Sequence, residues 1–201
     1  MIRKKFKRFL TIFILCVFST GSFAYVFAYV ELLSVQEYIV KAAFLYNFAK
    51  FVEWPAKTFT EEEAIMYLCI LGKDPFGVAI ESIEGKSVRG RQLVIRRLAK
   101  IENLEECPCH ILFISSSEEK RLAQIFLKLE DRNVLTVGDM KGFAQRGGII
   151  NFIMVENRIR FEINVKEAER TGLEISSKLL NLAKIVRAIQ RGEKNNETLP
   201  R

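Results

Sequence analysis

The sequence predicts an α/β fold with a mostly parallel sheet, helices on both faces and an antiparallel edge hairpin. Short apolar runs alternate with segments of helical periodicity, the pattern of parallel strands joined through helices. The run Ile111–Ile114 is wholly apolar, as strands buried on both faces are. Two further runs, Ile149–Val155 and Arg158–Ile163, are separated only by Glu156-Asn157 and predict the hairpin.

The first half of the fold is predicted to be a helix, a strand and a second helix. Apolar residues recur near helical spacing over Gln36–Val52, and Trp54-Pro55 ends this first helix. Its expected buried positions are Ile39, Ala43, Tyr46, Ala49 and Phe51. A strand is expected over Ile65–Leu71, bounded by Gly72, and Asp74-Pro75 is suited to start a helix that runs through Ile83.

The second half repeats the strand-to-helix order. Ser115-Ser116-Ser117 is a capping signal for a helix over Glu118–Leu129, and Gly172 ends a short helix over Asn164–Thr171. A final helix is predicted over Ser176–Arg191. The expected strands before the hairpin are Gln92–Leu98, Ile111–Ile114 and Val134–Val137, and residues 138–148 form a long connection.

The N-terminus is typical of an export signal. A basic stretch to Arg8 precedes an apolar run over Phe9–Phe18, and Ser22-Phe23-Ala24 offers small residues where a signal peptidase requires them. We expect cleavage after Ala24; the alternative is an uncleaved membrane anchor, because Phe9–Val30 is long enough to cross a bilayer. The expected organisation is therefore a signal peptide (1–24), one domain (35–191) and a flexible tail (192–201).

The positive charge of the chain is mostly a property of this leader. Subtracting its five cations from the formal net charge of +7 leaves +2. A nucleic-acid binder carries clustered cations interleaved with aromatic residues, and no such run follows the leader. We therefore predict no nucleic-acid partner. The leader cations are Arg3, Lys4, Lys5, Lys7 and Arg8.

Three cysteines follow the leader: Cys69, Cys107 and Cys109. Export favours a disulfide, and the odd number leaves one thiol over. A metal centre and a cofactor are not expected, because the paired Cys-x-x-Cys spacings of zinc sites are absent. A thiol enzyme using Cys107 or Cys109 is an alternative. Cys109 and His110 are not expected to pair, because neighbouring residues of a strand point to opposite faces. We predict that the protein is not an enzyme.

Aromatic residues crowd the first helix and the segment that follows it. One helix cannot direct all of them into a single core, so some are candidates for partner contacts; the alternative is that all of them pack in the core. With the loop over residues 142–148, the predicted partner-binding residues are Tyr46, Phe48, Phe51, Trp54, Phe143 and Arg146.

A second alternative is a small-molecule binding module. Sheets of this type often hold ligands at the carboxyl ends of their strands. An apolar pocket near Gly72–Phe76 and Ser115–Ser117 would favour it.

An ordered series of motifs resembles the YfiR family of periplasmic regulators and spans roughly Val35–Arg191. It opens with EYIVKAAFLYNFAKFVEWP over Glu37–Pro55. The remaining motifs are Cys69–Gly77, Cys109–Ser115, Leu135–Asp139, Gly142–Ala144, Gly147–Phe152, Arg160–Asn164 and Gly172–Leu180.

The resemblance implies regulation by contact. In that family YfiR represses an inner-membrane diguanylate cyclase, YfiN, by binding its periplasmic domain, and thereby limits cyclic di-GMP signalling and biofilm formation. An outer-membrane-associated lipoprotein, YfiB, sequesters YfiR and releases the cyclase. The partners expected for this chain are accordingly a YfiN-like cyclase and a YfiB-like lipoprotein, and a second copy of the chain is a further candidate.

The resemblance also implies a disulfide between Cys69 and Cys109. A second disulfide of part of the family would lie near residues 142–152, where this sequence has no cysteine. Cys107 is an extra thiol that could compete with Cys109 for Cys69.

Overall fold

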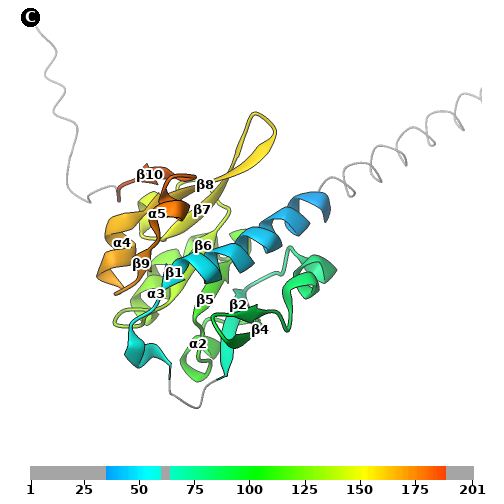
Figure 1. The fold of residues 1–201 in the computed structure, drawn as a ribbon. Coiled ribbons are helices and arrows are strands. Elements are labelled where there is room, and N and C mark those ends of the chain that lie inside the picture. The colour runs from blue at the N-terminus through cyan, green and yellow to red at the C-terminus, as the bar shows by residue number, and fades with distance from the viewer. Residues whose placement is uncertain (1–34, 60–63, 189–201) are drawn as a thin grey trace, which may run out of the picture. The chain divides into compact units, whose positions relative to one another are not determined.

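The computed structural model describes residues 35–59 and 64–188 (Figure 1). The chain divides into two compact units, Met1–Tyr38 and Ile39–Arg201, and the second contains the fold described below. The predicted signal peptide and tail lie outside the described residues. A helix occupies residues 35–51, in agreement with the first predicted helix.

Among the described residues, the main sheet has eight strands in the order β10-β8-β7-β6-β5-β2-β4-β3. The β7–β8 and β3–β4 pairs are antiparallel and the other neighbouring pairs are parallel, which confirms the predicted α/β class. The strands are β2 (Ile65–Leu71), β3 (Ser87–Val88), β4 (Arg91–Leu98), β5 (Ile111–Ile114), β6 (Leu135–Gly138), β7 (Ile150–Val155), β8 (Arg158–Asn164) and β10 (Lys184–Val186).

The connecting helices are short, and a small second sheet lies after the first helix. That sheet pairs β1 (Val52–Glu53) with β9 (Glu174–Ile175) in antiparallel fashion. The α-helices are α2 (Asn103–Glu106), α3 (Leu122–Lys128), α4 (Val165–Arg170) and α5 (Ser177–Leu180). The 3₁₀ turns are η1 (Ala56–Thr58), η2 (Gly77–Ile83), η3 (Ser116–Arg121) and η4 (Ala144–Arg146).

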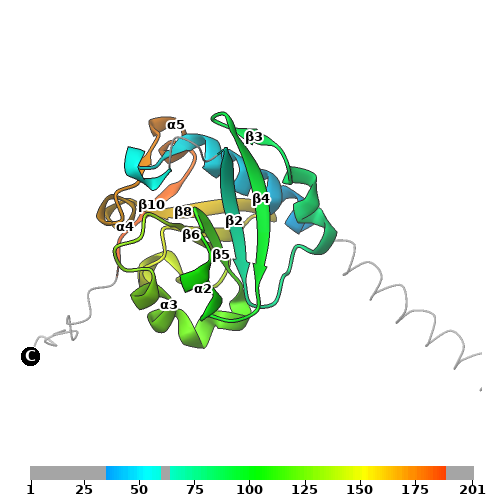
Figure 2. The same ribbon diagram turned by 90° about the horizontal axis from the view of Figure 1, so that it is seen from below.

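The first helix covers one face of the main sheet, and α2 and α3 cover the other (Figure 2). On the first face, the Phe48 ring lies 5.6 Å from Phe152 of β7 and 5.1 Å from Phe161 of β8. On the second face, Leu104 of α2 and Ile125 of α3 belong to one buried cluster with alternate residues of β2 and β5. Because successive side chains of a strand point to opposite faces of the sheet, each strand contributes residues to the packed layer on both faces.

The predicted inner face of the first helix is only partly correct. Ala49 is buried as predicted, and Tyr46 and Phe51 are partly buried. Ile39 is 47% exposed and Ala43 is exposed, and Ala42, Leu45 and Phe48 are buried in their place. The three-to-four residue spacing is correct, but the stripe is rotated because the phenylalanines of β7 and β8 accept the Phe48 ring.

The predicted final helix over Ser176–Arg191 is confirmed only at its start, and residues 189–191 lie outside the described residues. The helix α5 ends at Leu180, and the chain then forms β10, which pairs with β8 in parallel. The open edge of β8 offers backbone hydrogen bonds, and these outweigh the helical preference of residues 182–186. Leu182, assigned to the core of that helix, is 65% exposed.

Local sequence signals explain why the hairpin turn and the start of η3 were predicted correctly. Glu156 and Asn157 both have positive φ, 47° and 59°, as a two-residue hairpin turn requires. The hydroxyl of Ser115 accepts a hydrogen bond from the backbone N–H of Ser117 and caps η3, which continues into α3. The predicted helix over Glu118–Leu129 is thus a 3₁₀ turn followed by an α-helix.

Candidate functional site

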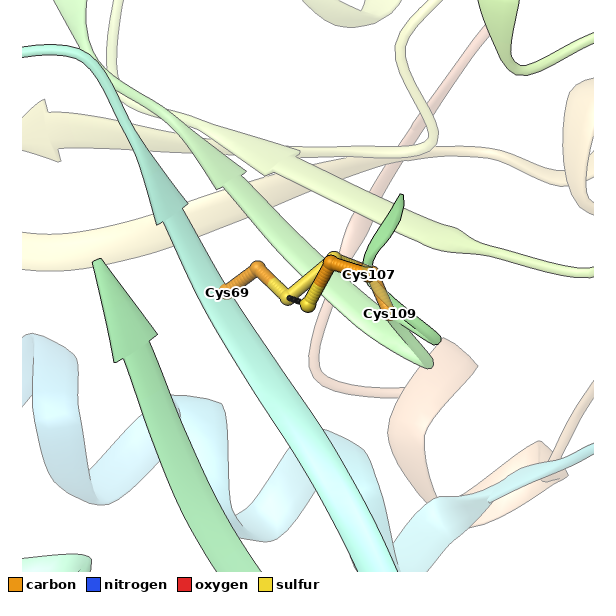
Figure 3. A group of neighbouring side chains, drawn as sticks. All are labelled: Cys69, Cys107 and Cys109. Atoms are coloured by element: carbon orange, nitrogen blue, oxygen red, sulfur yellow. Dashed lines mark hydrogen bonds between the residues drawn. A yellow bond between two sulfur atoms is a disulfide. The ribbon is translucent and has the colours of Figure 1, made fainter. Parts of the chain in front are cut away.

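A buried disulfide joins Cys69, in the middle of β2, to Cys109, two residues before β5 (Figure 3). The two Cα atoms are 5.9 Å apart, and the cysteines are 40 residues apart in sequence. Cys69 is 0% exposed and Cys109 is 5% exposed. The bridge therefore closes a long loop inside the core.

Apolar side chains enclose this bridge on the face covered by α2 and α3. The buried cluster that contains both cysteines also contains Leu104, Leu112 and Ile125. Reduction needs a thiolate to reach a sulfur atom, so the enclosure protects the bridge from thiols in solution.

The third cysteine lies against the bridge. Cys107 directly follows α2, and its S–H donates to the Sγ of Cys69 at 3.5 Å. The three sulfur atoms lie within 4.8 Å of one another (Figure 3). Burial raises the pKa of the half-buried Cys107 thiol, although Arg96 and Arg132 act in the opposite direction. Near neutral pH this cysteine is therefore a thiol.

Backbone contacts hold Cys107 in place. Arg132 donates from its guanidinium to the carbonyl oxygens of Leu104 and Cys107, at 2.5 and 2.8 Å. The N–H of Cys109 donates to the Cys107 carbonyl at 2.8 Å. This segment of three residues is therefore a fixed turn.

The sulfur cluster does not offer three thiolates in this form. A soft metal such as zinc binds deprotonated thiolates, and two of the three sulfurs are joined to each other. With the Cys69–Cys109 bond formed, Cys107 is the one cysteine of the three that can offer a thiolate.

His110 is engaged away from the cysteines. Its Nδ1 accepts a hydrogen bond from the backbone N–H of Tyr67 at 3.0 Å, and its ring stacks on Phe59 at 4.5 Å. The Cys109 sulfur is in the disulfide. The alternative of an enzyme using Cys109 and His110 therefore lacks both its thiolate and a base directed at it.

Protein atoms occupy the space between Gly72 and Ser117, where the small-molecule alternative places a ligand pocket. A Cβ added at Gly72 would lie 2.4 Å from Ser117 Oγ and 2.7 Å from the Glu118 side chain. The carboxyl end of β2 is thus packed directly against η3. This contact leaves no space for a ligand between Gly72 and Ser117.

Comparison with known proteins assigns the family. The model of the YfiR/HmsC-like family matches residues 38–184. The chain belongs to the YfiR/HmsC-like family. These proteins are a family of regulators of diguanylate cyclase.

One solved structure with a similar chain path is the ABC domain from Streptococcus pneumonia in complex with L-Trp. It has 8% sequence identity and a TM-score of 0.46, and the match covers 60% of this chain. The match spans 55% of that protein's chain.

In this YfiR/HmsC-like protein, two of the six predicted partner-binding residues are unavailable to a partner. Phe48 and Phe143 are both 0% exposed. Phe48 lies on the face of the first helix that packs against Phe152 of β7, and the Phe143 ring fills the space beside Gly138 and Gly148. The exposure expected of these rings is therefore wrong, because the sheet and the two glycines provide a site for each of them.

The other predicted residues reach the surface to different degrees. Tyr46, Phe51 and Trp54 are partly buried, and Arg146 is exposed. Arg146 forms an ion pair with Glu119 at 2.8 Å, which ties residues 142–148 to η3.

Tyr46 lies at the centre of a basic surface that the sequence did not indicate. The Nζ atoms of Lys50 and Lys86 lie 5.2 and 5.4 Å from the centre of the Tyr46 ring. The Tyr46 hydroxyl donates to the Ser87 carbonyl at 3.0 Å. Arg89 contacts the Lys50 carbonyl at 3.3 Å. We call Tyr46, Lys50, Lys86 and Arg89 the Tyr46 surface.

A row of polar side chains around the buried Glu162 crosses the other end of the sheet. Glu162 of β8 accepts hydrogen bonds from Lys184 of β10, at 2.9 Å, and from Gln145, at 3.1 Å. Burial acts to raise the pKa of Glu162, but hydrogen bonds from Lys184, Gln145 and Asn151 leave it below the usual 4.5. Glu162 is therefore an anion in the folded protein even under mildly acidic conditions.

This row predicts a loss of stability in acid. A carboxylate whose pKa is lower in the folded chain stabilises the fold above the unfolded pKa. That contribution is lost as the pH falls below 4.5 and through the folded value. We expect Glu162→Gln to flatten the acid limb of the unfolding free energy, measured by denaturant titrations at several pH values. Glu174→Gln, at an exposed carboxylate, is the control, and an unchanged acid limb in Glu162→Gln would contradict the assignment.

Proposed function

We propose that the protein is a periplasmic repressor of an inner-membrane diguanylate cyclase and acts by binding the periplasmic domain of that cyclase. The observation that carries the proposal is the match of the YfiR/HmsC-like family over residues 38–184. Cyclic di-GMP is made in the cytoplasm, so the repressor would act on the enzyme and not on the messenger.

Two features support a periplasmic location. The leader predicts export with cleavage after Ala24. The Cys69–Cys109 disulfide is of the kind that persists in an oxidising compartment.

Within residues 35–59 and 64–188, no helix has the length and apolarity needed to cross a membrane.

Binding, and not catalysis, suits the residues that are present. The Cys109 sulfur is in a disulfide, the Cys107 pKa is raised, and His110 Nδ1 is hydrogen-bonded to the backbone. A ligand protein shifts a two-state enzyme by its difference in affinity for the two states. Several kcal/mol of such a difference is within reach of a protein interface.

The Tyr46 surface is the proposed contact with the cyclase. It combines an aromatic ring with three cations, and aromatic and arginine side chains are enriched at interfaces. One of the cations, Arg89, is paired with Glu53 at 2.9 Å. Lys50 and Lys86 give the surface an excess of positive charge, so its partner surface should be acidic. A YfiB-like lipoprotein would release the cyclase by competing for the repressor.

Deleting the gene should raise cyclic di-GMP in the cell, and the wild-type gene should restore the low level. Lys86→Glu should restore it poorly and should weaken binding to the purified periplasmic domain of the cyclase. The expected loss is about 1 kcal/mol, roughly fivefold in Kd, because an attractive charge becomes repulsive.

Lys100→Glu is the matched control for this experiment. It makes the same charge change on an exposed residue beyond the carboxyl end of β4, whereas the Tyr46 surface borders the start of that strand. Unchanged cyclic di-GMP after deletion would contradict the repressor role. Equal binding by Lys86→Glu and Lys100→Glu would contradict the Tyr46 surface.

A further inference from the structure

We propose that Cys107 is an exchange thiol for the buried bridge. It can displace Cys109 from Cys69, and so connects a disulfide sealed in the core with thiols in solution. This inference concerns the redox chemistry of the chain and does not depend on the proposed binding function.

The first support is proximity. The Cys107 sulfur lies 3.5 Å from Cys69 Sγ, within contact distance of the atom it would attack. Two further contacts, from Arg132 and from the Cys109 N–H, fix the Cys107 carbonyl, so the thiol is held near the bridge. Positioning of this kind raises the rate of a reaction between two groups of one molecule.

The second support is access. Cys69 and Cys109 are 0% and 5% exposed, whereas Cys107 is half-buried. Cys107 also lines a surface cavity of about 530 Å³ together with Tyr67 and Arg96. A thiol in solution can therefore approach Cys107, while the two bridged sulfurs are shielded from it.

The sulfur geometry shows what movement the exchange requires. Attack on a disulfide proceeds in line with the bond that breaks, which would place Cys107 one S–S bond, about 2 Å, farther from Cys109 than from Cys69. With Cys107 at 3.5 Å from Cys69, that arrangement exceeds the 4.8 Å within which all three sulfurs lie. Cys107 thus lies beside the bond, and its side chain must shift before it attacks.

The exchange balances without an oxidant or a reductant. The Cys107 thiol loses its proton to solvent, and the thiolate attacks Cys69 Sγ. A Cys69–Cys107 bond forms, the Cys69–Cys109 bond breaks, and Cys109 leaves as a thiolate that takes up a proton. Cys69, Cys107 and Cys109 together hold one disulfide and one thiol before and after the step.

An external dithiol can then reduce the exchanged form. Its thiolate attacks Cys107 Sγ, and the Cys69 thiolate leaves. The second thiol of the reagent displaces Cys107 from the mixed disulfide. The dithiol is oxidised, and Cys69, Cys107 and Cys109 are all left as thiols. Because burial raises the pKa of Cys107, the rate of the internal exchange step, in which the Cys107 thiolate attacks, should rise with pH below that pKa.

The first test uses Cys109→Ser in the full chain under air. We expect the proteolytic peptide that contains Cys69 to be linked to the peptide that contains Cys107, with neither cysteine alkylated by iodoacetamide. Alkylation of both Cys69 and Cys107 in a folded Cys109→Ser protein would overturn the proposal.

The second test keeps the native bridge and so does not depend on the folding of Cys109→Ser. Native Cys107→Ser should be reduced by dithiothreitol about tenfold more slowly than wild type, since only attack on shielded sulfurs remains. Glu106→Gln, an exposed neighbour, should be reduced at the wild-type rate. Equal reduction rates for Cys107→Ser and wild type would overturn the proposal that Cys107 is an exchange thiol.

Discussion

Cys69→Ala is expected to lower the free energy of unfolding by about 4 kcal/mol in the chain-entropy description of disulfides. The bridge spans 40 residues, so its removal frees a long loop in the unfolded chain. Cys69 is the choice because it is the common partner of both possible bridges. The free energy is measured by urea titration of the oxidised protein.

Cys107→Ala is the matched control for this experiment, since it removes a sulfur and keeps the Cys69–Cys109 bridge. It should change the stability by less than about 1 kcal/mol, as a half-buried small residue does. Wild type in excess dithiothreitol should approach the stability of Cys69→Ala. A Cys69→Ala protein as stable as wild type would show that the bridge does not stabilise this fold.

Phe143→Ala is expected to cost about 4 kcal/mol, the usual range for removing a buried aromatic ring. The ring is 0% exposed and fits against two glycines: a Cβ at Gly148 would lie 2.1 Å from it, and one at Gly138 would lie 2.8 Å from it. It also packs on Phe126, with the ring centres 5.8 Å apart. Its removal leaves a cavity under residues 142–148. Thermal unfolding measures the loss.

Leu127→Ala is the control for Phe143→Ala, because Leu127 is 70% exposed on the neighbouring helix α3. It should change the melting temperature little. A loss of less than about 1 kcal/mol in Phe143→Ala would mean that the loop and α3 close over the vacated space.

The strands of this protein were predictable where apolar composition alone determines them. The predicted strands Ile65–Leu71 and Ile111–Ile114 coincide with β2 and β5, which lie in the middle of the sheet and are covered on both faces. The β7–β8 hairpin was predictable for a different reason, since Glu156-Asn157 accepts the positive φ of a tight turn.

The predictions fail where contacts with a distant part of the chain determine the local structure. Helical spacing could not show which face of the first helix meets Phe152 and Phe161, since these residues are about a hundred positions away. The composition of residues 184–186 also could not show that one edge of β8 was open for these residues to pair with as a strand. In both cases long-range packing outweighs local preference.

The candidate site was predictable in part. The resemblance to the family implied the Cys69–Cys109 pairing, and the extra thiol of Cys107 was evident from the sequence. The position of the Cys107 thiol beside the bridge was not evident, because it depends on the turn held by Arg132, 25 residues further on. The Tyr46 surface was not predictable as a whole, because its cations come from the first helix and from the turns on either side of β3.

The contact between Tyr67 and His110 gives this protein a built-in spectroscopic reporter. Because Nδ1 accepts the Tyr67 N–H, the neutral imidazole carries its own proton on Nε2. The chain has a single histidine, so its ring nitrogen resonances need no assignment. Their chemical shifts would report, in one spectrum, whether β2 and the residue that leads into β5 keep their alignment when the neighbouring sulfurs change partners.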